Sequence, residues 1–205
     1  MITLYGSSKS RSFRALWALE EAELAYEYKK IKLGSQDKNG SQAVEYKKIN
    51  HQGKVPALVD GQFIIAESAA ILNYIAMQAP DKNLIPLADV KLRARYDEIS
   101  FFVLADLEQP LWTYSKHRFV LPKELRLLEI KKTTQYEFAR SIDALQYYLD
   151  NKNYAINDHF TMADILIAQT LDWAASIQFT IPDNLTNYAH RMYQRSACQR
   201  ALLKA

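Results

Sequence analysis

The stretch of residues 53–68, Gly-Lys-Val-Pro-Ala-Leu-Val-Asp-Gly-Gln-Phe-Ile-Ile-Ala-Glu-Ser, constrains the fold more than any other part of the chain. Two short apolar runs, residues 57–59 and 63–65, are separated by an Asp-Gly pair, and glycine permits the positive φ of a tight turn. Pro56 stands at the head of the first run, where it removes no interior hydrogen bond of a sheet. The stretch therefore predicts a β-hairpin.

The same stretch predicts a binding site for a small peptide that carries a free carboxylate. Pro56 is a candidate for a cis peptide bond, since X–Pro bonds adopt this form far more readily than other bonds. A cis bond would turn the N–H and C=O groups of Val55 outward, free to pair with an extended peptide. Ser68 is expected to cap a helix over residues 68–77, where its hydroxyl and the positive helix end favour an anion.

This combination resembles the glutathione-binding segment of the cytosolic glutathione transferases, in particular bacterial members of the serine type. In that family an extended Val-Pro is followed by Glu-Ser or Gln-Ser at the next helix start. The resemblance implies that Val55 binds the cysteinyl main chain of glutathione. It implies that Glu67 binds the γ-glutamyl amine and Ser68 the γ-glutamyl carboxylate. Lys54 is placed to pair with the glycyl carboxylate, and equally to be an exposed lysine at a loop tip.

The order of predicted elements indicates an α/β domain followed by an all-α domain. Apolar periodicity predicts strand, helix, strand, helix, the hairpin and a last helix; apart from the hairpin, these cover residues 2–5, 13–22, 25–33, 43–49 and 68–77. This βαβ-α-ββ-α order resembles the thioredoxin fold. The prediction is a thioredoxin-like, glutathione-binding domain over residues 1–78, a linker over 79–88, and an all-helical domain over 89–205 that contributes the electrophile site.

The second domain is expected to begin with a long helix over residues 90–114, with Pro110 as a candidate site for a bend. Pro122 fits the first turn of the next helix, which runs to about residue 149. Thr-Met-Ala-Asp at residues 161–164 has the spacing of a capping box, so Asp164 is interpreted as a capping residue of a buried helix over 162–175. The surrounding Phe-Thr-x-Ala-Asp-Ile pattern is typical of the helical domain of glutathione transferases. Two short helices are expected over residues 185–195 and 197–204.

The group that stabilises the glutathione thiolate is expected in the turn after the first strand. A free thiol with a pKa of roughly 8.5 is mostly protonated at neutral pH, so a transferase must stabilise the anion. The resemblance makes Ser10 the first choice for a hydroxyl that donates to the sulfur, and Arg11 a competitor whose charge stabilises the thiolate by itself. Ser12 is an alternative and also a candidate helix N-cap. Tyr5 matches the tyrosine of other classes only loosely and is interpreted as sheet packing.

The electrophile is expected to bind beside the loop after the first strand and the first long helix of the second domain. Trp112 and Tyr114 offer flat apolar walls, and Lys116 favours an acidic or polarised acceptor. The alternative is that the aromatic side chains belong to the core and the lysine faces solvent. No metal site is expected, because His117 has no second ligand at helical spacing and the other histidines are scattered.

Composition indicates a globular protein with neither a nucleic-acid nor a membrane partner. The net charge of +3 is small and the Lys-Lys pairs are isolated. No apolar run reaches the length of a membrane span. Cys198 is the only cysteine, which excludes intramolecular disulfides. Together with a first segment that shows no signal-peptide pattern, this favours the cytoplasm.

The resemblance implies an enzyme, a glutathione S-transferase that conjugates the glutathione thiolate to small electrophiles in detoxification. It implies glutathione as co-substrate, no metal, and a homodimer. Two alternatives remain open. The first is a glutathione-dependent isomerase, dehalogenase or peroxidase on the same fold, because the same thiolate serves each reaction. The second is a non-catalytic, transferase-like protein that regulates a partner through its surface.

Overall fold

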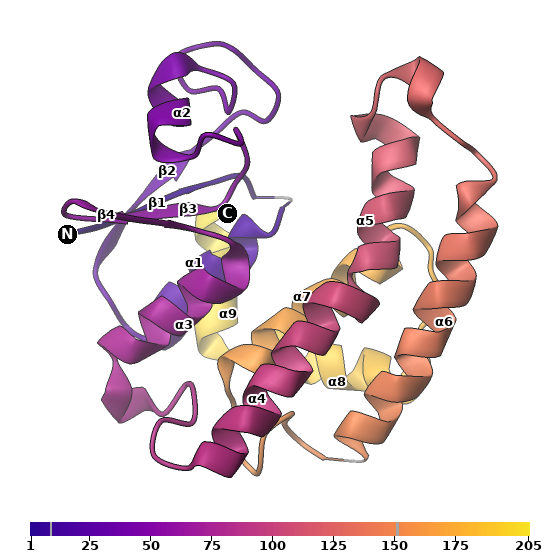
Figure 1. The fold of residues 1–205 in the computed structure, drawn as a ribbon. Coiled ribbons are helices and arrows are strands. Elements are labelled where there is room, and N and C mark those ends of the chain that lie inside the picture. The colour runs from indigo at the N-terminus through magenta and orange to yellow at the C-terminus, as the bar shows by residue number, and fades with distance from the viewer. Residues whose placement is uncertain (9, 151) are drawn as a thin grey trace. The chain divides into compact units, whose positions relative to one another are not determined.

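The computed structural model of the protein describes residues 1–8, 10–150 and 152–205. The chain divides into two compact units, one made of residues 1–85 and 193–205 and the other of residues 86–192 (Figure 1). The boundary near residue 85 lies within the linker expected over 79–88. The last thirteen residues differ from the expectation, because the sequence placed them in the helical domain and the structure packs them with the first unit.

The first unit is built on a mixed sheet of four strands in the order β2-β1-β3-β4. β1 pairs in parallel with β2 and antiparallel with β3, which is antiparallel to β4. The inner strands β1 and β3 carry most of the buried strand residues, whereas the edge strands β2 and β4 are largely exposed. The strands are β1 (Ile2–Gly6), β2 (Tyr26–Lys30), β3 (Ala57–Asp60) and β4 (Phe63–Ala66). The predicted hairpin is confirmed, with Gly61 at a φ of +60° between its strands.

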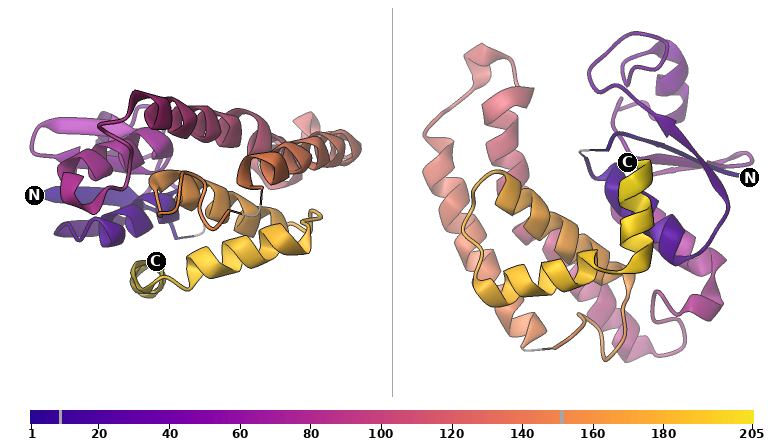
Figure 2. Two further views of the ribbon diagram at one scale, coloured as in Figure 1. Left: turned by 90° about the horizontal axis from the view of Figure 1, so that it is seen from below. Right: turned by 180° about the vertical axis from the view of Figure 1, so that it is seen from behind.

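Helices cover both faces of this sheet: α1, α3 and α9 lie on one face and α2 on the other (Figure 1, Figure 2). The bounds of the helices are α1 (Ser12–Glu21), α2 (Val44–Ile49), α3 (Ser68–Gln78), the 3-10 turn η1 (Pro80–Lys82) and α9 (Ser196–Lys204). The apolar faces of α1 and α3 are buried; the fully enclosed side chains there are Leu16, Trp17, Leu19, Ile71, Leu72 and Ile75. The thioredoxin-like order predicted from the sequence is confirmed.

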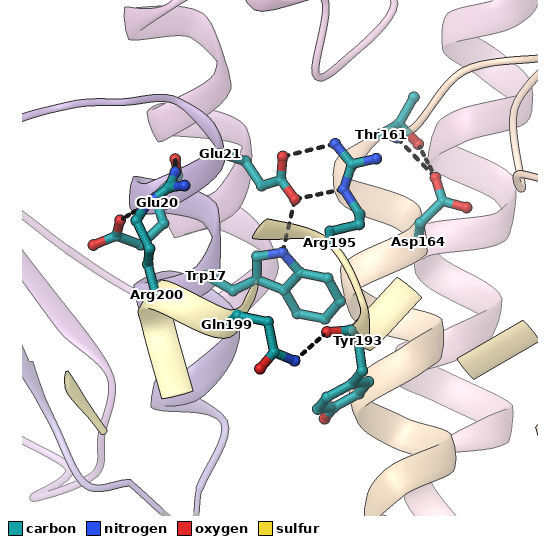
Figure 3. Close-up of polar contacts among 9 residues, drawn as sticks. All are labelled: Trp17, Glu20, Glu21, Thr161, Asp164, Tyr193, Arg195, Gln199 and Arg200. Carbon is teal, nitrogen blue, oxygen red and sulfur yellow. Dashed lines mark hydrogen bonds and ion pairs between the residues drawn. The ribbon is translucent and has the colours of Figure 1, made fainter. Parts of the chain in front are cut away.

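Ion pairs link the C-terminal residues to α1 within the first unit. The Glu21 carboxylate, whose side chain is 7% exposed, accepts from Arg195 Nε at 2.6 Å and from its Nη2 at 2.8 Å (Figure 3). Glu20, 8% exposed, accepts from Arg200 Nε at 2.8 Å and from the Lys204 ammonium. Burial alone would raise the pKa of Glu20, but hydrogen bonds led by that of Lys204 hold the pKa below its ordinary value.

The second unit is helical throughout the part of the chain that the structure describes. Its segments are α4 (Val90–Phe102), the π-helical η2 (Val103–Leu107), α5 (Gln109–Ser115), the π-helical η3 (Lys116–Val120), the 3-10 turn η4 (Lys123–Leu125), α6 (Ile130–Leu149), α7 (Met162–Ser176) and α8 (Asp183–Tyr193), which ends one residue into the first unit. The single helix expected over residues 90–114 is thus interrupted. Pro110 has no N–H to give to the Asp106 carbonyl, and that carbonyl instead accepts from Ser141 Oγ at 3.0 Å.

Pro122 does not begin a long helix, so that expectation was wrong. Pro122 has an extended ψ of 144° and precedes the 3-10 turn η4, while α6 begins only at Ile130. A proline favours a first helical turn locally, but it does not require the following residues to continue the helix.

The capping role of Asp164 is confirmed. Its carboxylate accepts the main-chain N–H of Thr161 at 2.7 Å, and the two residues form a capping box at the start of α7 (Figure 3). It also accepts the N–H of Ala155 at 2.8 Å and the hydroxyl of Tyr188. Burial raises the pKa of Asp164, although these hydrogen bonds oppose the rise. The carboxylate therefore organises the unit and is fully engaged in doing so.

Candidate functional site

The residues around Val55 form an open main-chain edge at the head of β3. The Val55–Pro56 peptide bond is cis, as the sequence suggested. Within residues 1–8, 10–150 and 152–205, no hydrogen bond reaches the N–H or C=O group of Val55. The preceding carbonyl, that of Lys54, is held by the Tyr46 hydroxyl at 2.6 Å and by Asn50 Nδ2 at 2.9 Å. The Lys54 carbonyl is therefore held in place by the protein, while the N–H and C=O groups of Val55 are able to pair with a ligand.

The turn before Val55 depends on Gly53. Gly53 has a φ of +62°, and a Cβ there would lie 2.4 Å from Gln42 Nε2 and 2.7 Å from the Ser41 carbonyl oxygen. Gln42 Nε2 donates to the Gly53 carbonyl at 3.3 Å. Lys54 follows with an exposed side chain, which fits either of its two expected roles.

Glu67 and Ser68 lie together at the start of α3, but not in the capping arrangement expected. Glu67 is the N-cap residue and Ser68 the first helical residue, so the interpretation of Ser68 as the N-cap was wrong. Glu67 is exposed and has φ +68° and ψ 116°, a conformation that costs a non-glycine residue roughly 1–3 kcal/mol. Strain of this kind is found most often at binding and catalytic sites.

Ser68 itself is buried, and its Oγ accepts from Arg14 Nη1 at 3.3 Å. Arg14 is fully buried in α1 and was not singled out in the sequence. The sequence did contain a signal, because Arg14 is the only charged residue in the apolar run of residues 13–19. A helix that is apolar on every side is buried, so a charged residue within it is buried as well and needs a polar partner. Arg14 joins α1 to the start of α3, which are the two elements that carry most of the candidate site.

A network of serine hydroxyl groups shapes the turn before α1. Ser10 Oγ donates to the Ser7 carbonyl at 2.6 Å, accepts the Ser12 N–H at 3.1 Å, and lies 2.9 Å from Ser12 Oγ. Ser12 Oγ accepts the Ser7 N–H at 3.1 Å, and Ser12 is fully buried against Gly6. Ser10 is half-buried and therefore accessible to a ligand, whereas Ser12 is enclosed.

The two other candidates near the sulfur position have different surroundings. Arg11 is half-buried and is the N-cap residue of α1, beside the positive end of that helix. Tyr5 is half-buried in β1, with its ring centroid 6.0 Å from that of Tyr46, and the Lys29 ammonium lies 5.6 Å from the Tyr5 centroid. The environment of Tyr5 is thus one of sheet packing.

The residues expected to bind the electrophile lie on consecutive turns of the second unit. Trp112 and Tyr114 belong to α5, Lys116 begins η3, and each is half-buried. The Tyr114 ring packs at 5.3 Å from that of Phe179, and the Arg118 guanidinium lies 5.9 Å from the Tyr114 centroid. One side of Tyr114 therefore belongs to the packing of its unit.

No three or more His, Cys, Asp or Glu side chains come together as a group that could hold a metal ion in the described part of the chain. Across the same residues, none of the helices combines the length and the apolar character that crossing a bilayer requires.

Comparison with known proteins identifies the family. Residues 1–77 match the glutathione S-transferase N-terminal domain and residues 116–195 the C-terminal domain. A glutathione S-transferase of Triticum aestivum is 31% identical over 189 residues, which cover 90% of this chain and 82% of that protein. A probable maleylacetoacetate isomerase of Caenorhabditis elegans is 35% identical over 168 residues, covering 77% and 71% of the two proteins. A solved structure of a sphingomonad glutathione S-transferase complexed with glutathione has a TM-score of 0.84 at 26% identity and covers 98% of each chain. With the βαβ-α-ββ-α unit and the capped helical unit already in view, these matches show that the chain belongs to the glutathione S-transferase family.

Proposed function

We propose that the protein conjugates glutathione to small electrophiles and that Val55, Glu67 and Ser68 bind the tripeptide. The observation that carries this proposal is the main chain of Val55, which no hydrogen bond from the described part of the chain reaches, since an extended peptide needs one donor and one acceptor to pair with. A peptide laid along this edge, as the resemblance to the family implies, presents its charged end to the start of α3.

At the γ-glutamyl end, the protein offers a negative group to the ligand's amine and hydrogen-bond donors to its carboxylate. The exposed Glu67 carboxylate pairs with the α-amine, and the buried Ser68 hydroxyl and the first N–H groups of α3 receive the α-carboxylate. Arg14 supports this end from beneath, because its bond to Ser68 Oγ brings a positive charge close to the carboxylate. Lys54 pairs with the glycyl carboxylate at the opposite end.

At the sulfur, Ser10 and Arg11 stabilise the thiolate. In the free protein the Ser10 hydroxyl donates a hydrogen bond to the Ser7 carbonyl, and rotation about the Cβ–Oγ bond would redirect this hydrogen to the sulfur. Arg11 and the N-terminus of α1 add positive charge at the same place. Each unit by which they lower the thiol pKa corresponds to about 1.4 kcal/mol. The thiolate then forms a sulfur–carbon bond with the electrophile, which expels its leaving group with the bonding electrons or takes up a proton.

The remaining parts of the proposal come from the family rather than from a contact in the structure. The first domain binds glutathione, and Trp112, Tyr114 and Lys116 of the helical domain line the electrophile site. The protein functions as a homodimer in the cytoplasm and needs no metal. These expectations are supported by the resemblance to cytosolic transferases and by the single cysteine.

Calorimetric titration with glutathione tests the binding site. Glu67→Gln keeps the size of the side chain and removes the charge that pairs with the amine, so the dissociation constant is expected to rise about tenfold or more. Glu45→Gln, an exposed carboxylate of α2, serves as the matched control and is expected to leave the affinity unchanged. An unchanged affinity for Glu67→Gln would remove the basis of the proposed site.

Thiolate absorbance of the glutathione complex, followed against pH, tests the sulfur end. Ser10→Ala is expected to raise the pKa of the bound thiol, whereas Ser7→Ala keeps the carbonyl and controls for loss of a hydroxyl in the same turn. If the bound thiol has the same pKa in Ser10→Ala and in the original protein, then Arg11 or the helix end stabilises the thiolate instead.

The isomerase, dehalogenase or peroxidase alternative stays a prediction. The likeness to a probable isomerase of Caenorhabditis elegans is consistent with it but does not favour it over conjugation. Product analysis on a panel of electrophiles separates them, because an isomerase regenerates free glutathione and a conjugating enzyme consumes it. The non-catalytic alternative predicts a folded protein without glutathione affinity, which the titration above measures directly.

A further inference from the structure

The connection between α5 and α6 exposes an unusual number of large apolar side chains. We call residues 116–132 the α5–α6 tip; it lies at the end of these two helices (Figure 1). Five of its apolar side chains are exposed, with exposed fractions of 60%, 47%, 58%, 59% and 81% for Phe119, Val120, Leu125, Leu127 and Leu128. Single exposed apolar residues need no explanation, but five within ten positions of the sequence make this segment a candidate for an interaction site.

Hydrogen bonds hold the two limbs of the tip together. The Arg126 guanidinium donates to three main-chain carbonyl groups at 2.8, 3.2 and 3.2 Å, those of Leu121, Arg118 and Phe119. On the other side, His117 Nδ1 accepts the N–H of Leu127 at 3.0 Å. The polar groups thus face one another across the tip. These hydrogen bonds tie the segment together, while its large apolar side chains stay exposed.

The tip also concentrates positive charge. It contains six lysine and arginine residues against Glu124 and Glu129, which gives it a net charge of +4 with His117 neutral. The whole chain carries +3, so the rest of the chain carries −1. Four of these cationic residues are exposed, namely Arg118, Lys123, Lys131 and Lys132. The other two, Lys116 and Arg126, are half-buried.

We propose that the α5–α6 tip binds the surface of an anionic lipid bilayer. Exposed leucine and phenylalanine side chains among lysine and arginine are the combination that binds at an interface, since the apolar groups enter the headgroup region while the cations contact lipid phosphates. The charge of the tip, opposite to that of the rest of the chain, orients the protein with this end toward the bilayer. The sequence expectation of no membrane partner rested on the absence of a spanning segment, and a peripheral contact needs none.

Cosedimentation with lipid vesicles tests the proposal on the full chain. The protein is expected to bind vesicles of phosphatidylglycerol mixed with phosphatidylcholine, to leave vesicles of phosphatidylcholine alone in the supernatant, and to dissociate as salt is raised. Lys131→Gln combined with Lys132→Gln is expected to weaken binding about thirtyfold, at roughly 1 kcal/mol for each lysine near the surface. Leu125→Ser combined with Leu128→Ser is expected to weaken it tenfold or more, because it removes apolar insertion and keeps the charge.

Matched controls come from other exposed positions. Lys38→Gln with Lys47→Gln removes two exposed lysines outside the tip, and Leu203→Ser removes an 88% exposed leucine of α9. These variants are expected to bind vesicles within twofold of the original protein. Equal binding of the tip variants and these controls would overturn the proposal, as would equal binding to neutral and anionic vesicles. Absence of vesicle binding, with dissociation of a dimer in the Leu125→Ser and Leu128→Ser variant, would assign the tip to a contact between copies of the chain instead. The test does not depend on glutathione, so its outcome is independent of the proposed transferase site.

Discussion

Arg195→Ala should destabilise the protein more than Glu21→Gln, although both changes break the same ion pair. Removing Arg195 leaves the Glu21 carboxylate charged and 7% exposed, with the Trp17 indole N–H at 2.9 Å as a remaining donor. Removing one partner of a fully buried pair costs about 3–5 kcal/mol. Because the Arg195 side chain is itself 31% exposed, water reaches one side of the pair, and we expect about 2–3 kcal/mol here.

Glu21→Gln removes the charge but keeps an oxygen for the Trp17 indole. The Arg195 side chain is 31% exposed and stays in contact with solvent, so the expected cost is only about 1 kcal/mol. For a chain of this size, 2–3 kcal/mol corresponds to a fall in Tm of roughly 4–12 °C and 1 kcal/mol to about 2–4 °C. The double variant should be less destabilised than the sum of the two single variants, since Glu21→Gln already removes the buried charge that Arg195→Ala leaves unpaired.

Thermal unfolding followed by circular dichroism measures the three variants. Arg95→Ala is the matched control, because Arg95 pairs with Glu98 in an exposed setting, with 57% and 45% of the side chains accessible. It is expected to change stability by less than about 0.5 kcal/mol. Equal destabilisation by Arg195→Ala and Glu21→Gln, or a larger effect of Glu21→Gln, would refute the argument that the buried carboxylate sets the cost.

Three further outcomes follow from single positions. Gly53→Ala is expected to lower the free energy of unfolding by about 1–3 kcal/mol, and with it Tm, because the new Cβ would collide with Gln42 and the residue has a φ of +62°. The same change is expected to weaken glutathione binding. A Tm equal to that of the original protein would contradict this. Glu67→Gly is expected to keep or raise Tm while glutathione affinity falls, since glycine adopts φ +68° without strain; a large fall in Tm measured by calorimetry argues against strain at Glu67. The pKa of Glu20 is lowered in the folded state, so its ion pairs stabilise the protein above the ordinary glutamate pKa of 4.5, and this stabilisation is lost as pH falls through the lowered value. Lys204→Gln should therefore have a lower Tm than the original protein near neutral pH, and the difference in Tm should become smaller in acid. A difference in Tm that grows in acid would contradict the lowered pKa of Glu20.

Local chemistry explains the features that the sequence predicted well. An Asp-Gly pair between apolar runs specifies a tight turn whatever surrounds it, and the hairpin forms as expected. The Thr-x-x-Asp spacing specifies a capping box because both residues act within one helical turn. In each case the atoms that decide the structure lie within a few residues of one another.

The serine turn shows where local information stops. The resemblance makes Ser10 the first choice and Ser12 an alternative, and local sequence does not show which of the two hydroxyl groups is accessible. Packing separates them, since Ser12 is fully buried against Gly6 whereas Ser10 is only half-buried. Likewise, nothing near Ser68 in the sequence indicates that Arg14 donates to it from 54 residues away.

The sequence by itself determined the family, the βαβ-α-ββ-α unit, the hairpin with its cis proline and the start of α7, because turns, caps and periodicity act over a few residues. Only the tertiary structure decided that the last helix packs on α1, that the helix before Pro110 changes to a π turn, and that no hydrogen bond from the described residues reaches the main chain of Val55. These outcomes depend on groups far apart in the chain, such as Glu21 with Arg195 or Asp106 with Ser141. These pairs form only when the helices pack against one another. Residues far apart in the sequence come into contact at that point, and local sequence patterns do not specify which of them will meet.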